Sequence, residues 1–184
     1  MDDFSFLLEH IKNNNEQAFV RLVEAYNGMV FQLAFSFLKN TEEAEDLTQD
    51  VFLSVYENIG QFRNESSLKT WIYRITVNKS LNRQRKLKWC RFFRPIGSVP
   101  SDDKNLITED TNPQYAVLNK ELKAKLTNAI DNLPERQRTA FTLYKYQDLG
   151  HQEIAEIMGL SVSAVESLIH RAKQNLQAAL AEFR

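Results

Sequence analysis

The sequence predicts an all-α protein made of two small helical domains joined by a flexible linker. Apolar residues recur at helical intervals through most of the chain, and its 184 residues include only five glycines and four prolines. Recurrence every three or four residues is typical of amphipathic helices. The pattern stops between Pro95 and Pro113, where prolines, a glycine and acidic residues flank isolated apolar positions. We therefore expect a first domain over residues 1–94, a linker over 95–113 and a second domain over 114–184.

Four helices are expected in the first domain. Their apolar stripes predict the bounds Phe4–Lys12, Phe19–Asn40, Thr41–Ile59 and Leu68–Lys88. Thr41 is expected to cap the third helix, because a hydroxyl can accept a hydrogen bond from the free amides of the first turn. The segment Gly60–Ser67 is expected to be a loop that leads into the fourth helix.

The second domain is expected to end in two short helices joined by a tight turn. A helix over Tyr115–Leu133 comes first, and Pro134 stands at the start of the next helix, where its missing amide is harmless. That helix leads into the segment Asp148–Leu176, in which Gly159 can adopt the left-handed conformation that ends a helix. Two helices joined in this way form the helix-turn-helix arrangement that reads duplex DNA.

The second helix of this segment carries a polar outer row. Ser163 is expected to cap it, and Glu166, three residues on, can complete a capping box. The outward positions suit base edges and phosphates, and they are Ser163, Glu166, Ser167, His170, Arg171 and Lys173. The alternative is an ordinary helical hairpin with a solvated face.

Charge is distributed unevenly, although the formal net charge is only −1. Residues 1–65 carry four basic and twelve acidic side chains, whereas residues 66–101 carry nine basic and no acidic ones. The basic residues are interleaved with Trp71, Tyr73, Trp89, Phe92 and Phe93. Positive charge next to stacking surfaces favours single-stranded or melted nucleic acid. The alternative is a solvated helix face with aromatic residues in the core.

The composition argues against an enzyme and against a metal site. Cys90 is the only cysteine, so one chain can form neither a disulfide framework nor a cysteine-based zinc site. The three histidines lack metal-ligand spacing, and neither a glycine-rich phosphate loop nor an activated serine motif is present. We expect no catalytic residue, no metal and no cofactor.

The sequence also predicts a cytoplasmic protein without direct membrane insertion. Asp2 and Asp3 stand where a signal peptide would carry basic residues. No apolar stretch is long enough to span a bilayer.

Four segments in this order resemble a bacterial RNA polymerase sigma factor, best matched by the extracytoplasmic-function (ECF) group. They are DLTQDVF at Asp46–Phe52, SSLKTWIYRITVNKSLNRQRK at Ser66–Lys86, LPERQRTAF at Leu133–Phe141, and EIAEIMGLSVSAVESLIHRAK at Glu153–Lys173. The resemblance covers nearly the whole chain apart from the linker and the extreme ends. It implies sigma domain 2 followed by sigma domain 4, a specificity subunit without catalytic residues of its own.

The resemblance implies three binding surfaces. Core RNA polymerase would bind at Asp46, Gln49, Asp50 and Phe52. The melted non-template strand of the −10 promoter element would bind at Phe62, Arg63, Asn64, Lys69, Trp71, Arg74, Asn78, Lys79 and Arg83. The duplex −35 element would be read by the polar outer row of the second domain. Family members are commonly restrained by an anti-sigma factor, which is therefore expected as a further partner.

Two other functions are compatible with parts of the sequence. A helix-turn-helix activator or repressor would bind duplex DNA alone, but it would need neither the acidic helix nor the basic aromatic helix of the first domain. In a helical adaptor that binds only proteins, the uneven distribution of charge would have no functional role.

Overall fold

The computed structural model describes Ile11 and residues 15–63, 65–92 and 124–181, and these residues are helical apart from short connections. The all-α prediction is confirmed for this part of the chain, in which no strand is found. Contacts divide the chain into one unit over Met1–Pro100 and another over Ser101–Arg184. The predicted linker 95–113 lies outside the described residues, as do the predicted helix Phe4–Lys12 apart from Ile11 and the first part of Tyr115–Leu133.

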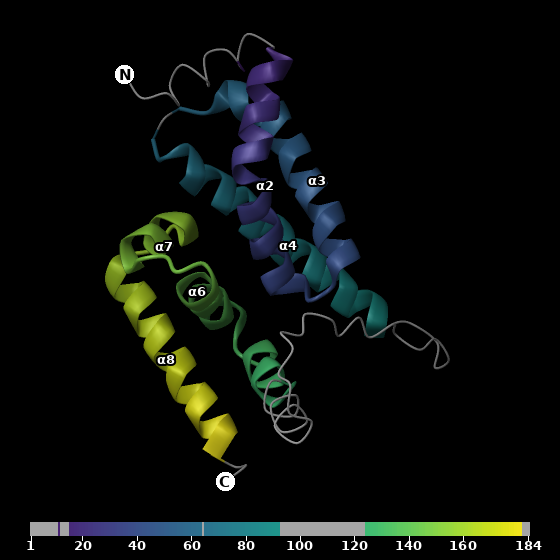
Figure 1. Cartoon of the computed structure of the whole chain (residues 1–184). Helices are drawn as coiled ribbons and strands as arrows, with labels where there is room; N and C mark the ends of the chain where they lie inside the picture. The colour runs from purple at the N-terminus through teal and green to yellow at the C-terminus, as the bar shows by residue number, and fades with distance from the viewer. Residues whose placement is uncertain (1–10, 12–14, 64, 93–123, 182–184) are drawn as a thin grey trace, which may run out of the picture. The chain divides into compact units, whose positions relative to one another are not determined.

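Among its described residues, the first unit contains three long helices. They are α2 (Glu16–Leu38), α3 (Thr41–Asn58) and α4 (Leu68–Phe92), and the short 3₁₀ turn η1 (Ile59–Gln61) follows α3. Helices α2 and α3 lie side by side, and α4 crosses both (Figure 1). Their facing stripes form one apolar core, whose fully buried members include Leu22, Val51, Val55 and Ile72. The sequence predicted these stripes, because each follows the helical period.

The corner between α2 and α3 corrects one prediction. Lys39 adopts a left-handed conformation with φ of 56° and donates its amide to the carbonyl of Phe35. Asn40 is the cap of α3, since its side-chain oxygen accepts a 2.8 Å hydrogen bond from the amide of Glu43. Thr41, the predicted cap, is the first helical residue. Asparagine and threonine can both cap a helix, and neighbouring polar residues make the choice ambiguous from sequence.

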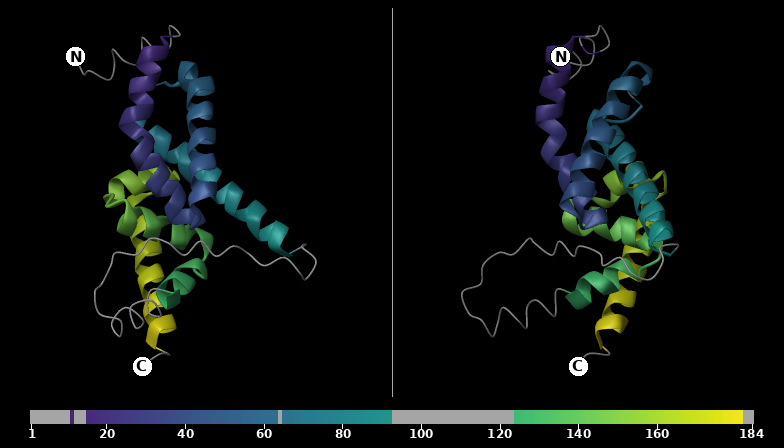
Figure 2. Two further views of the ribbon diagram at one scale, coloured as in Figure 1. Left: turned by 45° about the vertical axis from the view of Figure 1, so that its right-hand side comes forward. Right: turned by 90° about the vertical axis from the view of Figure 1, so that its right-hand side faces the viewer.

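The second unit contains a helix over 124–131, then α6 (Glu135–Tyr146), α7 (His151–Met158) and α8 (Val162–Ala181). Helices α6 and α7 both pack on α8, which Figures 1 and 2 show as the long yellow helix. Leu143 of α6, Ile154 of α7 and Val165 of α8 are fully buried. These three helices therefore share one core, and the predicted helix-turn-helix arrangement is confirmed.

The turn between α7 and α8 forms as the sequence predicts at its glycine. Gly159 has φ of 63°, and the next amide, that of Leu160, donates to the carbonyl of Ala155 at 3.0 Å. These bonds satisfy carbonyls at the end of α7, and the left-handed conformation is favourable for glycine because it lacks a Cβ.

The start of α8 differs from the prediction. Ser161, not Ser163, accepts a hydrogen bond from the amide of Ala164, at 3.3 Å. Ser163 lies inside the first turn, so Ser163 and Glu166 do not form the predicted capping box. A glutamate does cap the start of α7: Glu153 accepts a 2.9 Å hydrogen bond from the amide of Gly150, which is half of a capping box because glycine has no side chain to return the contact.

Candidate functional site

Helix α8 presents its predicted polar row to solvent. All six predicted residues of this row are exposed, while Val165, Ile169, Ala172 and Leu176 on the opposite face are buried. The hydroxyl of Ser167 donates to the carbonyl of Ser163 at 2.9 Å, which leaves its oxygen as an acceptor. The helix thus joins a packed inner face to an outer face of hydrogen-bonding and cationic groups.

Contacts with α6 and α7 hold the outer residues of α8, and sequence reasoning did not find them. Glu166 lies 3.5 Å from Nδ1 of His151, an ion pair when that imidazole is protonated. Nζ of Lys173 lies 4.8 Å from the centre of the Tyr144 ring, which is also 5.6 Å from the His151 ring. Side chains from three helices therefore meet beside the row. No sequence signal predicts them, because their spacing along the chain follows no helical period.

A second contact fixes α8 nearer its carboxyl end. Nδ2 of Asn175 donates to Oε1 of Gln137 on α6 at 2.8 Å, across 38 positions of sequence. This side-chain bond adds to the apolar packing of the two helices. The orientation of the row is therefore set by several elements of the unit.

The basic helix α4 exposes only some of its predicted DNA-binding side chains. Lys69 and Asn78 are exposed, and Arg74 and Lys79 are half-buried. Ser67 caps the helix by accepting a 3.0 Å hydrogen bond from the amide of Thr70. Asn64 lies outside the described residues, whereas Arg63 beside it is exposed.

Two predicted aromatic contacts lie partly or wholly in the core of the first unit. Phe62 is only 6% exposed, and its ring lies 5.2 Å from the ring of the half-buried Trp71. Phe62 therefore anchors the loop after η1 and presents almost no surface to a ligand. Trp71 keeps an accessible part next to that loop.

Helix α3 places the predicted polymerase-binding residues on two different faces. Asp46, Gln49 and Asp50 are exposed along its outer face, and Leu53 continues that face with 62% exposure. Phe52 is buried in the core, with 7% exposure. Phe52 therefore stabilises α3 by packing in the core.

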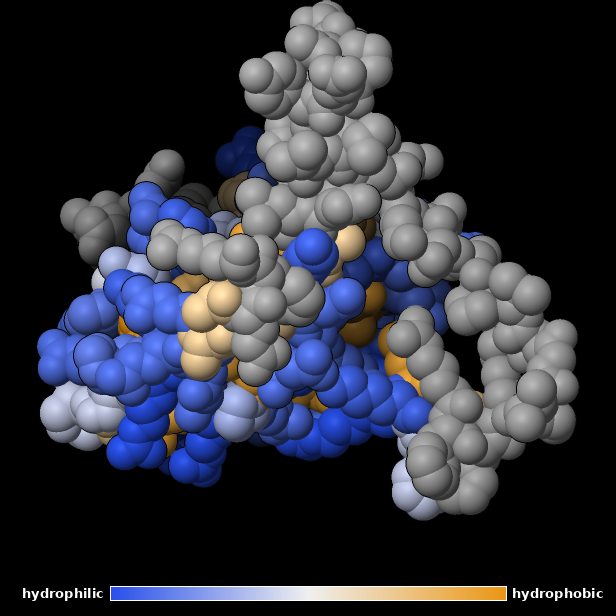
Figure 3. Space-filling view, turned by 90° about the horizontal axis from the view of Figure 1, so that it is seen from below, coloured by the Kyte–Doolittle hydropathy of each residue, from blue (hydrophilic) through white to orange (hydrophobic). Residues whose placement is uncertain are grey.

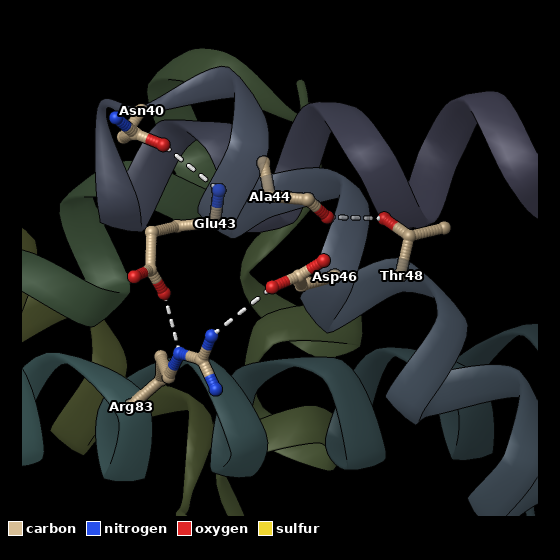
Figure 4. Close-up of polar contacts among 6 residues, drawn as sticks. All are labelled: Asn40, Glu43, Ala44, Asp46, Thr48 and Arg83. Atoms are coloured by element: carbon tan, nitrogen blue, oxygen red, sulfur yellow. Dashed lines mark hydrogen bonds and ion pairs between the residues drawn. The ribbon is translucent and has the colours of Figure 1, made fainter.

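Arg83 joins the basic helix to the acidic one. Its Nε lies 2.5 Å from Oε2 of Glu43, and its Nη2 lies 3.4 Å from Oδ2 of Asp46 (Figure 4). The hydrogen bond that Arg83 donates to Glu43 is the main cause that raises the pKa of Arg83. Burial opposes this rise, and the charges of Glu43, Asp46 and Asp50 add to it. The residue predicted to contact DNA is thus engaged by carboxylates.

Membrane-spanning helices and metal-ligand clusters are both absent from the part of the chain that the structure describes. None of its helices is both long and apolar enough to cross a bilayer. Within the same residues, no three His, Cys, Asp or Glu side chains lie close enough together to hold a metal ion. From below, hydrophilic side chains cover most of the coloured surface, and apolar ones show only in small areas (Figure 3).

Comparison with known proteins identifies the family. Residues 22–90 match the family described as Sigma-70 region 2, and residues 123–176 match the one described as Sigma-70, region 4. The chain is 33% identical over 181 residues to the RNA polymerase sigma-H factor of Pseudomonas aeruginosa, covering 95% of this chain and 92% of that protein. It is 29% identical to the ECF RNA polymerase sigma factor SigW of Bacillus subtilis, covering 96% of each. The chain is an ECF sigma factor of the sigma-70 family.

A solved structure agrees with this assignment. The sigma factor is similar to CnrH in a structure described as CnrH in complex with the cytosolic domain of CnrY, with a TM-score of 0.68, 25% identity and 96% coverage of both chains. Sigma factors are regulatory specificity subunits and not catalytic enzymes. This one therefore acts with RNA polymerase in promoter-specific transcription initiation.

Proposed function

We propose that this sigma factor directs core RNA polymerase to promoters with a −35 and a −10 element and helps to open the DNA. The observation that carries the proposal is the outer face of α8, where all six predicted contact residues are exposed above a buried stripe. A major groove about 12 Å wide admits one α-helix. Helix α8 enters it, and the contacts from α6 and α7 hold the helix at a fixed angle.

The residue types on α8 match the chemistry of base edges. Arg171 can donate to both major-groove acceptors of guanine, and Glu166 can accept from the amino group of cytosine. Because Ser161 caps the helix, Glu166 has no capping role, and its carboxylate contacts His151. Lys173 and His170 add positive or hydrogen-bonding groups suited to phosphate.

The first unit captures the opened −10 strand. Lys69, Asn78 and the half-buried Arg74 and Lys79 supply donors along α4, and Trp71 supplies an aromatic edge beside the loop that ends at Ser67. Phosphate contacts of this kind give affinity, while stacking accommodates unpaired bases. Phe62 anchors this loop by packing in the core of the first unit.

Core polymerase binds the outer face of α3. Asp46, Gln49 and Asp50 give it an acidic character, and the exposed Leu53 adds apolar area. Such a surface fits a partner with basic residues around an apolar contact. A charged rim speeds association and favours the correct partner.

An anti-sigma factor restrains the protein by covering both domains. The support is the likeness to CnrH, whose structure was solved with the cytosolic domain of CnrY.

Reconstituted transcription tests the proposed function. Purified core polymerase plus this chain should start transcripts at a defined subset of a random promoter library, and core alone should start none specifically. A helix-turn-helix regulator would need another sigma factor in the same assay. An adaptor that binds only proteins would show no promoter selection at all. Either result contradicts the proposal.

A further inference from the structure

Glu43 belongs to none of the predicted binding surfaces, yet it makes the main polar contact of Arg83. The two residues lie on different helices and are 40 positions apart in sequence, and about a quarter of each side chain is exposed. Asp46 contacts the same guanidinium from one turn further along α3 (Figure 4). Arg83 is therefore clamped between two carboxylates at the point where α3 and α4 meet.

The position of Glu43 is fixed by its own helix. Its amide is held by Asn40, the cap of α3, at 2.8 Å. It stands in the first turn, where the positive end of the helix dipole favours a carboxylate. A neighbouring bond ties the same corner to α4, because Nε2 of Gln84 donates to the carbonyl of Phe37 at 3.1 Å. The clamp, which consists of Arg83, Glu43 and Asp46, thus joins the rigid helices α3 and α4.

The charges around Arg83 favour this internal contact over an external anion. One guanidinium faces Glu43 and Asp46 directly, and the charge of Asp50 also acts on it. Carboxylates and phosphates bind a guanidinium in the same way. A DNA phosphate that approached Arg83 would have to displace a carboxylate and lie beside the one that stayed.

Asp46 connects the clamp to the outer face of α3. Its side chain is 63% exposed, so a basic partner can reach it without moving the helix. An external cation that binds Asp46 weakens its hold on Arg83. Of the two carboxylates, Glu43 alone then remains in direct contact with Arg83.

We propose that Glu43 is a positioning residue that, together with Asp46, keeps Arg83 away from DNA in the free sigma factor, and that polymerase binding at Asp46 removes one of the two carboxylate contacts, so that a phosphate of the opened strand can compete with Glu43 for Arg83. The inference rests on the proposed function, since it needs α3 to meet polymerase and α4 to meet DNA. Coupling of two binding events through one contact is reciprocal. DNA bound at Arg83 therefore also frees Asp46 for polymerase.

A pair of adjacent glutamates gives a matched test. Glu42→Gln and Glu43→Gln remove the same charge from the same turn of α3, but only Glu43 contacts Arg83. Binding of a fluorescently labelled single-stranded oligonucleotide to the full-length free protein is measured over a range of salt concentrations. Glu43→Gln should tighten binding roughly tenfold, and Glu42→Gln should change it far less. The slope of log affinity against log salt should steepen by about 0.7, which corresponds to one more phosphate contact on a single strand.

A double variant assigns the gain to Arg83. The combination of Glu43→Gln with Arg83→Gln should bind the oligonucleotide no more tightly than Arg83→Gln alone, because the released cation is absent. Melting curves followed by circular dichroism show whether each variant is folded. If Glu42→Gln and Glu43→Gln tighten binding equally, the effect is general charge and the inference is wrong.

Polymerase tests the coupling itself. In the holoenzyme the gain from Glu43→Gln on a −10 fork template should be clearly smaller than in the free protein, because polymerase has already loosened the clamp. An equal gain in both forms overturns the coupling. Failure of the proposed function looks different: the wild-type holoenzyme would then start no specific transcripts, whatever residue stands at position 43.

Discussion

Single polar residues decide where the helices of this sigma factor begin. Ser161 and Ser163 both stand near the start of α8, and only Ser161 accepts a hydrogen bond from a first-turn amide. Loss of such a cap typically costs about 1 kcal/mol of stability, whereas a surface substitution elsewhere stays within about 0.5 kcal/mol.

We therefore predict that Ser161→Ala lowers the free energy of unfolding by about 1 kcal/mol and that Ser163→Ala changes it little. Urea denaturation followed by circular dichroism measures both variants on the full chain. The critical result is which of the two variants loses more free energy of unfolding. A larger loss for Ser163→Ala would show that the capping register of α8 is the one expected from sequence.

At the scale of elements, the sequence predicts the helices well and their contacts poorly. The stripes of α2, α3, α4 and α8 follow the helical period, so their existence and buried faces could be read directly. Their ends differ from the predicted ones by up to four residues: α2 begins at Glu16 and not at Phe19, and α4 reaches Phe92 and not Lys88. At the starts of α3 and α8 the capping residue also differs, because Asn40 competes with Thr41 and Ser161 with Ser163.

In the candidate site, too, the sequence predicts some features and misses others. Residues on outward faces, such as Arg171 or Asp50, could be predicted from helical spacing alone. The contacts of Arg83 with Glu43 and of Glu166 with His151 could not, because they depend on how separate helices pack. The burial of Phe62 and Phe52 is missed for a related reason: an aromatic side chain suits a core as well as a ligand.

Two glycines in different elements should respond to alanine in opposite ways. Gly28 lies inside α2 with open space around an added Cβ, so Gly28→Ala should stabilise the first unit by about 0.5–1 kcal/mol. Gly159 has φ of +63°, so Gly159→Ala should destabilise the second unit by about 1–2 kcal/mol.

The two tryptophans allow these effects to be separated. Trp71 and Trp89 both belong to the first unit, so tryptophan fluorescence reports directly on that unit, while circular dichroism reports on all helices. In urea titrations, Gly28→Ala should raise the midpoint of the fluorescence transition. Gly159→Ala should lower a midpoint seen by circular dichroism. Stabilisation by Gly159→Ala would mean that the turn does not need its left-handed conformation.

At the scale of the whole molecule, the two DNA-binding surfaces proposed for the sigma factor differ in their chemistry. The second unit offers an ordered row on one helix, which suits the fixed pattern of base edges in a duplex. The first unit offers cations and an aromatic edge beside a loop, which suits a flexible strand. Substitutions in the two units should therefore affect different parts of one promoter.

Selection of bound promoters by the holoenzyme tests this separation. Arg171→Ala should relax the preference at one upstream position, by about 1–3 kcal/mol of discrimination, and keep the downstream preference. Lys79→Ala should weaken binding of all promoters to a similar degree, because a phosphate contact carries no sequence information. Gln177→Ala, at an exposed position further along α8, serves as the control for Arg171→Ala. If Arg171→Ala instead weakens every promoter equally, Arg171 binds phosphate, and base readout on α8 has to come from the residues nearer its amino end.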